Sequence, residues 1–340
     1  MLKKVKVLVV DDSLVFREAI SRGIGADPAI EVVGTASDPF MARDKILELE
    51  PEVLTLDVEM PKMNGIEFLR KLMPQYPLPV VVVSAVSENV FDALDAGAVD
   101  FVTKPDVRKA GGIDAFISEL ILKIKIASTA KVGHLKKEFK SEIASTRITK
   151  IPGTNRIIAI GASTGGTEAI FEVVKAFPRD MPGVVIVQHM PPVFTRMYAE
   201  RLNKACTMEV KEAENGDDVL QGRVLIAPGD QHMRIKKSGA RVFVECYKGE
   251  KVNGHCPSVD VLFDSVAEIF GSAAIGVILT GMGYDGARGI LGMRRKGAFT
   301  VGQDEASSVV YGMPKVAYDI GGVARQATLS QISHIVYSSL

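Results

Sequence analysis

The sequence has few cysteines, no net charge and no long apolar run. Its three cysteines, Cys206, Cys246 and Cys256, are odd in number and widely spaced, which argues against a disulfide framework or a zinc site. The 41 basic and 41 acidic residues balance, so the overall charge favours neither nucleic acid nor direct membrane insertion. No apolar run could span a bilayer, and the amino terminus lacks the apolar core of a signal peptide. We therefore expect a cytoplasmic protein with reduced thiols.

The chain of 340 residues is long enough for two domains that each bury a core. Apolar periodicity fades after residue 126 and returns near residue 154, and basic residues outnumber acidic ones between these points. We predict a first domain over residues 1–126, an exposed and partly helical linker over residues 127–153, and a second domain over residues 154–340. Both domains are predicted to be α/β and doubly wound. The second is expected to have a mainly parallel sheet and an added β-hairpin near residues 237–240.

Short apolar segments alternate with helix-like segments throughout the first domain, which is typical of a doubly wound parallel sheet. In such sheets ligands gather at the carboxyl ends of the strands. Polar residues stand at the ends of successive predicted strands, and these are Asp11, Asp12, Asp57, Ser84 and Lys104. Each alone fits an ordinary role, such as a helix cap or a surface charge. Their shared placement predicts that they surround one pit.

The residue types in this pit indicate phosphoryl chemistry. Three clustered carboxylates repel one another, so a hard cation such as Mg²⁺ is their expected partner. A carboxylate beside Mg²⁺ and a lysine ammonium can attack a phosphoryl group, because both cations offset the negative charge that develops.

The second domain opens with a glycine-rich turn that carries Ser163. The apolar run before it predicts a buried strand, and residues 167–177 predict a helix. The turn matches the pattern G-x-S-x-G as Gly161-Ala-Ser163-Thr-Gly165, which places an exposed nucleophile at a strand–turn–helix junction. The alternative is a tight turn in which Ser163 caps the helix. A phosphate-binding loop is disfavoured because no Gly-Lys-Ser/Thr follows.

Two more polar residues follow apolar strands of the second domain. His189 comes about one strand–helix–strand unit after Ser163, so adjacent parallel strands would bring both residues to one edge of the sheet. Asp285 lies in a later glycine-rich turn, where it is suited to orient the imidazole and also to cap a helix. The backbone of residues 281–283 is free to offer N–H groups to an oxyanion. The predicted set is a Ser-His-Asp triad, in an order that differs from the Ser-Asp-His order of α/β-hydrolases.

Residues 3 to about 122 resemble the receiver domain of two-component response regulators. The resemblance rests on Asp11-Asp12, on Asp57 followed by Met60-Pro61 and Asn64-Gly65, on Ser84, and on Asp100-Phe-Val-Thr-Lys104-Pro. It implies a flavodoxin-like fold, with Asp57 as the phosphoacceptor and Phe101 as the switch aromatic. It also implies that Mg²⁺ is bound by Asp11, Asp12, Asp57 and the Glu59 backbone carbonyl, and that Ser84 and Lys104 contact the phosphoryl group. The segment from Ser84 to Lys104 is slightly short for a receiver.

Residues from about 155 to 338 are similar to the catalytic domain of chemotaxis protein-glutamate methylesterases. The matching stretches are Gly161-Ala-Ser-Thr-Gly-Gly166, Val187-Gln-His-Met-Pro-Pro192, Ala227-Pro-Gly229 with His232-Met233, Pro257-Ser-Val-Asp-Val-Leu-Phe263, Leu279-Thr-Gly-Met-Gly-Tyr-Asp-Gly286, and Gln303-Asp-Glu-Ala-Ser307 with Tyr311-Gly-Met-Pro314. The resemblance implies Ser163 as nucleophile, His189 as base, Asp285 as orienting acid and the Met282 backbone N–H in the oxyanion hole. Cys256 stands where a basic residue is expected.

Together the two resemblances imply a carboxylic ester hydrolase that phosphorylation activates. Its substrate would be methylated glutamates on the cytoplasmic helices of chemoreceptors, and a chemotaxis histidine kinase would supply the phosphoryl group. Deamidation of receptor glutamines is a further expected activity, and the ester chemistry needs no cofactor. By analogy, the unphosphorylated receiver would cover the catalytic cleft. The alternative is a non-catalytic signalling adaptor that keeps the fold without turnover.

The remaining histidines are assigned structural roles. His134 falls in the linker, His334 in a terminal helix, and His232 in a turn-rich region. His255 is the one best placed to line the cleft.

Overall fold

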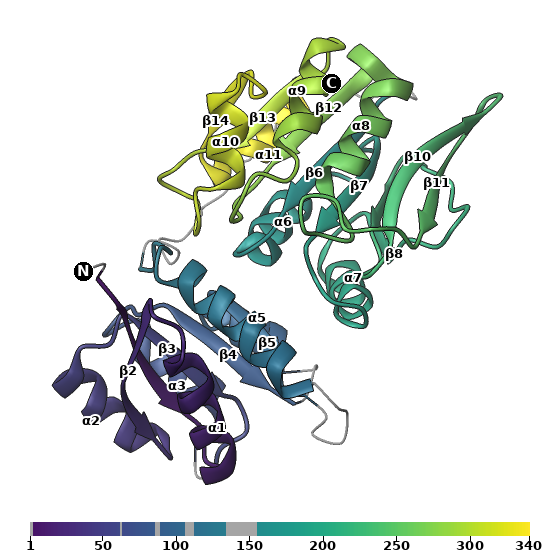
Figure 1. The fold of residues 1–340 in the computed structure, drawn as a ribbon. Coiled ribbons are helices and arrows are strands. Elements are labelled where there is room, and N and C mark those ends of the chain that lie inside the picture. Colours follow the sequence, from purple (N-terminus) through teal and green to yellow (C-terminus); the bar gives the residue numbers. More distant parts are fainter. Residues whose placement is uncertain (1–2, 62, 86–88, 106–111, 134–154) are drawn as a thin grey trace. The chain divides into compact units, whose positions relative to one another are not determined.

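The computed structural model describes residues 3–61, 63–85, 89–105, 112–133 and 155–340. The chain divides into two compact units, residues 1–137 and 138–340 (Figure 1). Residues 134–153 of the predicted linker, with His134, lie outside the described residues. The domain bounds derived from the sequence therefore stay a prediction.

The first unit is a five-stranded parallel sheet in the order β2-β1-β3-β4-β5. Its strands are β1 (Val5–Val10), β2 (Ile30–Ala36), β3 (Val53–Asp57), β4 (Val80–Ser84) and β5 (Asp100–Thr103). Its helices are α1 (Leu14–Gly25), α2 (Pro39–Leu49), α3 (Gly65–Leu72), α4 (Val90–Asp95) and α5 (Gly112–Ala127). Helix α1 packs with α5, and α3 packs with α2 and α4. This is the predicted flavodoxin-like fold.

Local sequence explains where these elements begin. Strands β3 and β4 are buried along their whole length, as expected of central parallel strands covered on both faces. Helix α2 starts where the Asp38 carboxylate accepts from two backbone N–H groups. Helix α3 starts where Asn64 Oδ1 accepts from the Glu67 N–H at 2.8 Å. Each cap satisfies donors that a helix start leaves unpaired.

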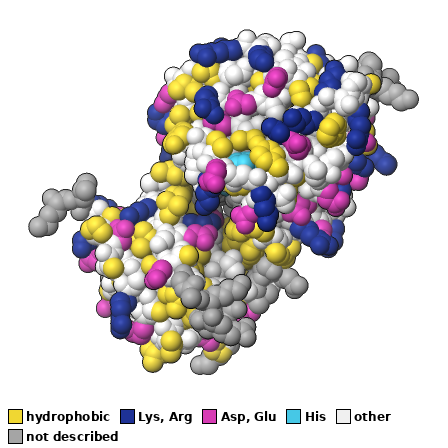
Figure 2. Space-filling view, turned by 45° about the vertical axis from the view of Figure 1, so that its right-hand side comes forward, with side chains coloured by type: hydrophobic (Ala, Val, Ile, Leu, Met, Phe, Trp, Pro, Cys, Tyr) yellow, Lys and Arg dark blue, Asp and Glu magenta, His cyan; other side chains and the backbone are white. Residues whose placement is uncertain are grey.

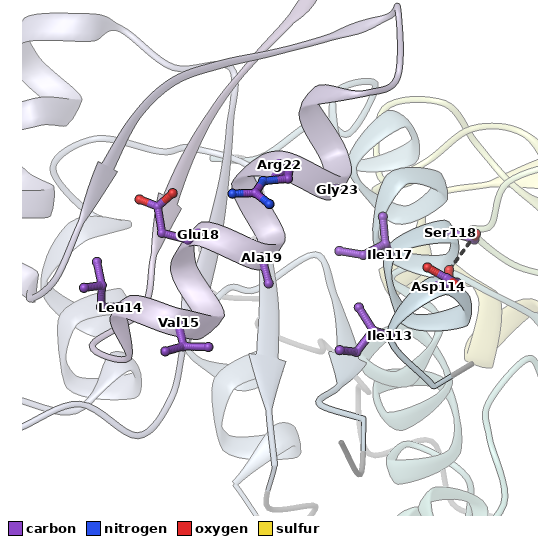
Figure 3. A pocket seen from close by; sticks show the side chains of 10 residues that line it. All are labelled: Leu14, Val15, Glu18, Ala19, Arg22, Gly23, Ile113, Asp114, Ile117 and Ser118. Atoms are coloured by element: carbon purple, nitrogen blue, oxygen red, sulfur yellow. Dashed lines mark hydrogen bonds between the residues drawn. The ribbon is translucent and has the colours of Figure 1, made fainter. Parts of the chain in front are cut away.

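A groove runs between α1 and α5, and Figure 3 shows the side chains that line it. Gly23 lets the two helices approach, because a Cβ there would lie 2.7 Å from Ile117 Cδ1. Leu14 and Val15 are exposed at the start of α1. This surface begins at Leu14, two residues after Asp12.

Gly65 is required where α3 meets the end of β3. A Cβ at this position would lie 2.2 Å from the Asp57 backbone carbonyl oxygen, which cannot move without displacing the end of β3. We expect Gly65→Ala to destabilise the first unit by about 1–3 kcal/mol. Native-state hydrogen exchange of the β3 amides measures this unit separately from the second one.

The matched control is Gly25→Ala at the end of α1. A Cβ there meets only Val32 Cγ2, at an ordinary 3.8 Å, so the exchange free energy should change by less than about 0.5 kcal/mol. Equal effects of the two substitutions would contradict the packing argument.

The second unit contains a seven-stranded parallel sheet in the order β14-β13-β12-β6-β7-β9-β8. Its strands are β6 (Ile157–Ala162), β7 (Gly183–Gln188), β8 (Glu209–Glu212), β9 (Arg223–Ile226), β12 (Ala274–Ile278), β13 (Phe299–Gln303) and β14 (Arg325–Ala327). Its helices are α6 (Gly166–Lys175), α7 (Phe194–Ala205), α8 (Val259–Phe270), α9 (Ala287–Arg295), α10 (Met313–Asp319) and α11 (Leu329–Ser338), with a 3₁₀ turn η1 (Gly271–Ala273). The mainly parallel sheet is as predicted.

The predicted β-hairpin forms a separate two-stranded antiparallel sheet, β10 (His232–Ser238) with β11 (Arg241–Tyr247). Its apolar side packs on α8, where Met233, Ile235 and Val244 join the same buried cluster as Leu262 and Phe263. This packing fixes α8 and the loop that precedes it against the sheet.

Strand β12 ends at Ile278, two residues before Thr280. The Thr280 hydroxyl donates to the Thr164 backbone carbonyl at 3.0 Å and accepts from the Val310 N–H at 2.9 Å, and the Thr280 backbone N–H donates to Gln303 Oε1. These bonds take Thr280 out of the ladder and join three loops at the carboxyl end of the sheet.

The charge balance of the sequence is also visible on the surface. On the face shown in Figure 2, basic and acidic side chains are interspersed. Among the residues described, no helix has both the length and the apolar character needed to cross a bilayer.

Candidate active site and phosphorylation site

The predicted pit of the first unit is present at the carboxyl end of its sheet. Asp11 and Asp57 are buried, and Lys104 reaches both of them. Lys104 Nζ donates to Asp57 Oδ2 at 2.6 Å and forms an ion pair with Asp11 Oδ2 at 2.9 Å. The sheet order explains this convergence, because β1 and β3 are neighbours while β5 lies next to β4.

The carboxylates of Asp11, Asp12 and Asp57 each offer an oxygen within 4.8 Å of the others. Burial raises the pKa of Asp57 to about 6, and Asp11 adds to this, although Lys104 opposes it. A divalent cation would offset this crowding of negative charge, so the donor set fits a hard metal ion. Glu59 lies beside the cluster, since its N–H donates to Asp57 Oδ1 and it lines a depression together with Asp12.

The two other predicted receiver residues are also near this edge. Ser84 ends β4 and is buried, and its carbonyl accepts from the Lys104 N–H at 2.9 Å. Phe101 is 5% exposed, and Lys123 Nζ lies 5.1 Å from the centre of its ring. Phe101 is therefore directed inward in this structure.

In the second unit, three adjacent parallel strands carry the predicted triad. Strand β6 pairs with β7 on one side and with β12 on the other. Ser163 follows β6, His189 follows β7, and Asp285 lies in the loop after β12. Backbone bonds join the three segments, since the Ser163 N–H donates to Thr280 and the His189 N–H donates to Ala162.

Ser163 lies in a tight turn and is partly exposed. Its backbone carbonyl accepts from the Gly166 N–H at 2.7 Å and from Gln188 Nε2 at 2.9 Å. These two hydrogen bonds fix the turn. Gly165 adopts φ +75°, and glycine reaches this left-handed region at little cost. A Cβ at Gly281 would lie 2.6 Å from Ser163 Cβ, so only glycine leaves room beside the serine.

His189 and Asp285 are joined by a hydrogen bond. His189 Nε2–H donates to Asp285 Oδ2 at 2.9 Å, which fixes the neutral tautomer and leaves Nδ1 as the basic nitrogen. Nδ1 is buried and has no hydrogen-bond partner among the described residues. Among the described residues, Nδ1 also makes no hydrogen bond with Ser163. Such bonds between catalytic groups are often absent in enzymes without substrate.

Asp285 is a buried carboxylate with an unusually complete set of donors. Besides His189, it accepts from Asn253 Nδ2 at 2.7 Å, from Ser258 Oγ at 2.7 Å and from the Val259 N–H at 2.6 Å. Burial alone would raise the pKa of Asp285, but these donors outweigh it and hold the pKa well below its usual range. Asp285 is therefore ionised at neutral pH.

Among the backbone N–H groups predicted for an oxyanion, that of Gly281 is already used. It donates to the Val310 carbonyl at 3.0 Å. Within the described structure the N–H groups of Met282 and Gly283 make no hydrogen bond, and the Met282 side chain is exposed. This segment can thus offer Met282 and Gly283, but not Gly281.

Sequence reasoning missed the residues that surround His189 and Asp285. It assigned no role to Asn253 or Ser258, although both contact Asp285. His255, expected at most to line the cleft, stacks on His189 with ring centres 3.7 Å apart and an 8° angle between the planes. An Asn-Gly dipeptide such as Asn253-Gly254 favours a turn, but nothing in the sequence shows what the turn contacts.

The two units thus combine a sheet edge of clustered carboxylates with a sheet edge that carries serine, histidine and aspartate. The first is typical of phosphoacceptor domains and the second of serine hydrolases. Residues 158–336 match the CheB methylesterase family, and residues 7–110 match the response regulator receiver domain. The chain belongs to the CheB methylesterase family and carries an amino-terminal receiver domain.

Relatives of nearly full length support this assignment. The chain is 62% identical to protein-glutamate methylesterase/protein-glutamine glutaminase 2 of Syntrophomonas wolfei, covering 99% of this chain and 98% of that one. It is 49% identical to protein-glutamate methylesterase/protein-glutamine glutaminase of Salmonella typhimurium, covering 98% and 96%. The crystal structure of the Thermotoga maritima CheB methylesterase catalytic domain is similar at a TM-score of 0.53 and 38% identity, covering 54% of this chain and 98% of that one.

Proposed function

We propose that this chain hydrolyses glutamate γ-methyl esters on chemoreceptors, and deamidates receptor glutamines, when Asp57 is phosphorylated. The observation that carries the proposal is the hydrogen bond between His189 and Asp285 beside Ser163, in a chain of this family. The substrate is the set of methylated cytoplasmic helices of chemoreceptors, and the phosphodonor is a chemotaxis histidine kinase. The protein acts in the cytoplasm.

Ser163 Oγ attacks the ester carbonyl carbon while His189 Nδ1 takes its proton. Asp285 holds the imidazole and stabilises the imidazolium that forms. His189 then gives the proton to the leaving methoxide, so methanol departs and an acyl-enzyme remains. Water attacks the acyl group, again with His189 as base, and releases glutamate and free Ser163. With a glutamine side chain the same steps release ammonia instead.

Negative charge develops on the carbonyl oxygen at each attack, and the N–H of Met282 is placed to bind it. The Gly283 N–H is a second donor from the same segment. Both are available because neither makes another hydrogen bond in the described chain.

In the receiver, Asp57 is the phosphoacceptor. Asp11, Asp12, Asp57 and the Glu59 backbone carbonyl would hold Mg²⁺, which when bound shields the carboxylates from the incoming phosphoryl group. Lys104 neutralises one phosphoryl oxygen and Ser84 donates to another. Phe101 is the switch aromatic that responds to phosphorylation.

Asp57→Asn should remove activation by phosphorylation while leaving basal hydrolysis. A small-molecule phosphodonor with Mg²⁺ should raise methanol release from methylated receptor about tenfold in the wild type, and should leave Asp57→Asn unchanged, because the amide cannot accept the phosphoryl group. The control is Asp44→Asn, which changes an exposed aspartate of α2 and should respond like the wild type. Equal stimulation of Asp57→Asn would refute the assignment of Asp57 as phosphoacceptor. If the phosphodonor stimulated neither the wild type nor any variant, the esterase would not be regulated by phosphorylation.

A further inference from the structure

A two-residue hairpin turn, residues 252–255, lies against the candidate triad. Val252 and His255 exchange two backbone hydrogen bonds of 3.0 Å. Asn253 and Gly254 between them have φ values of 55° and 84°, as in the tight turns that Asn-Gly favours. We call residues 252–255 the clamp turn, because its two polar side chains contact different members of the triad.

Asn253 lies between two buried carboxylates. Its Nδ2 group donates to Asp285 Oδ1 at 2.7 Å and to Asp260 Oδ2 at 2.8 Å. Asp260 is 2% exposed, accepts from the Gly289 N–H at 2.7 Å and has Arg288 Nε at 3.8 Å. Without the Asn253 amide, the buried carboxylates of Asp285 and Asp260 would each lose a hydrogen-bond donor, and the repulsion between their negative charges would not be offset. Asn253 therefore fixes the position of Asp285 and keeps it ionised.

His255 contacts the other side of the pair. The bond to Asp285 is the one hydrogen bond that the His189 ring makes within the described structure, and a ring held at one nitrogen can swing about that bond. The parallel stack at 3.7 Å removes this freedom. The stack tolerates a charged His189 only while His255 is neutral, since two imidazolium rings at this distance would repel.

The surroundings keep His255 neutral. Burial lowers the pKa of His255 to about 4, with further lowering by His189 and Lys251 that Asp285 only partly opposes. The other charged groups about this cluster are Asp260, Asp264 and Arg288. His189 can thus gain a proton during turnover while its stacked neighbour gains none.

We propose that the clamp turn positions the triad, with Asn253 fixing the Asp285 carboxylate and His255 fixing the plane of the His189 ring. Both are positioning residues that act on Ser163 through His189. The inference rests on the proposed function for its kinetic part, because only turnover makes the position of Nδ1 matter. Its structural part concerns the state of His189 in the resting protein.

The test compares full-length Asn253→Ala, His255→Ala and His255→Phe with the wild type. Methanol release from methylated receptor, with phosphodonor present, should show kcat falling about 10- to 100-fold in the two alanine variants, with KM changed less than about twofold. His255→Phe should recover most of kcat, because a neutral ring restores the stack. Asn215→Ala is the matched control, since Asn215 holds another loop through the Cys246 N–H, and it should retain the wild-type kcat.

A second measurement does not depend on turnover. NMR of the His189 imidazole nitrogens in the resting protein should show a smaller population of the Nε2–H tautomer in Asn253→Ala than in the wild type, because Asp285 loses a donor that fixes its carboxylate against that N–H. A tautomer population and a kcat that match the wild type in both alanine variants would overturn the proposal. A changed tautomer population in a chain that releases no methanol at all would uphold the clamp and reject the esterase.

Discussion

Ser163→Ala is expected to lower methanol release from methylated receptor by at least about 10⁴-fold. In the proposed mechanism the substitution removes the atom that forms the acyl-enzyme, and any residual rate then comes from water attacking a bound ester. The loss should appear in kcat rather than KM, because alanine keeps the Cβ that lies beside Gly281 and Gln188 still holds the turn through the backbone carbonyl of residue 163. Release of methanol at saturating receptor measures it directly.

The control is Ser330→Ala, which removes one hydroxyl from the exposed face of α11 and should leave the rate unchanged. A Ser163→Ala protein that still turned over at more than a hundredth of the wild-type rate would require another nucleophile. Absence of release from the wild type in every condition would favour the alternative of a non-catalytic adaptor. In the structure Gly165, and not Ser163, is the N-cap of α6.

The positions of Ser163, His189 and Asp285 were predictable because of a topological rule. In a parallel sheet, residues that follow adjacent strands meet at one edge, and the strand pairs β6–β7 and β12–β6 provide that adjacency. The same rule brought the receiver residues together. Here the sequence needed to reveal only the strand ends, and apolar runs mark strand ends clearly.

The contacts of the clamp turn were not predictable in this way. Residues 252–255 belong to no strand of the main sheet, and their place depends on how α8 packs against the β10–β11 hairpin. An Asn-Gly pair predicts a turn from local backbone preference alone, but the hydrogen bond from Asn253 to Asp285 spans 32 residues of chain. The same limit explains why Gly281 was counted as an oxyanion donor, since its bond to Val310 is also a tertiary contact.

Asp285→Asn should lower kcat by about 10⁴-fold and also destabilise the second unit. Asn253 and Ser258 hold Oδ1 as an acceptor, so the amide nitrogen would take the place of Oδ2 and face His189 Nε2. The imidazole would then accept there and carry its proton on Nδ1, where it can no longer act as the base. The Val259 N–H, which now donates to Oδ2 at 2.6 Å, would lose its acceptor, at a cost of about 1–3 kcal/mol.

The control is Asp217→Asn, which alters a carboxylate that is 18% exposed and accepts from the Glu214 N–H in another loop of the second unit. It should cost stability in the same way and retain most of kcat, so a comparable fall in kcat would show that the effect arises from local unfolding.

The pH dependence gives a second criterion. Folding lowers the pKa of Asp285, so its contribution to stability is present at neutral pH and is lost only below the ordinary carboxyl value of about 3.9. The difference in unfolding free energy between the wild type and Asp285→Asn should therefore stay constant from pH 8 to about pH 5 and narrow in stronger acid; a difference that narrows already near neutrality would mean that Asp285 is not the ionised partner of His189.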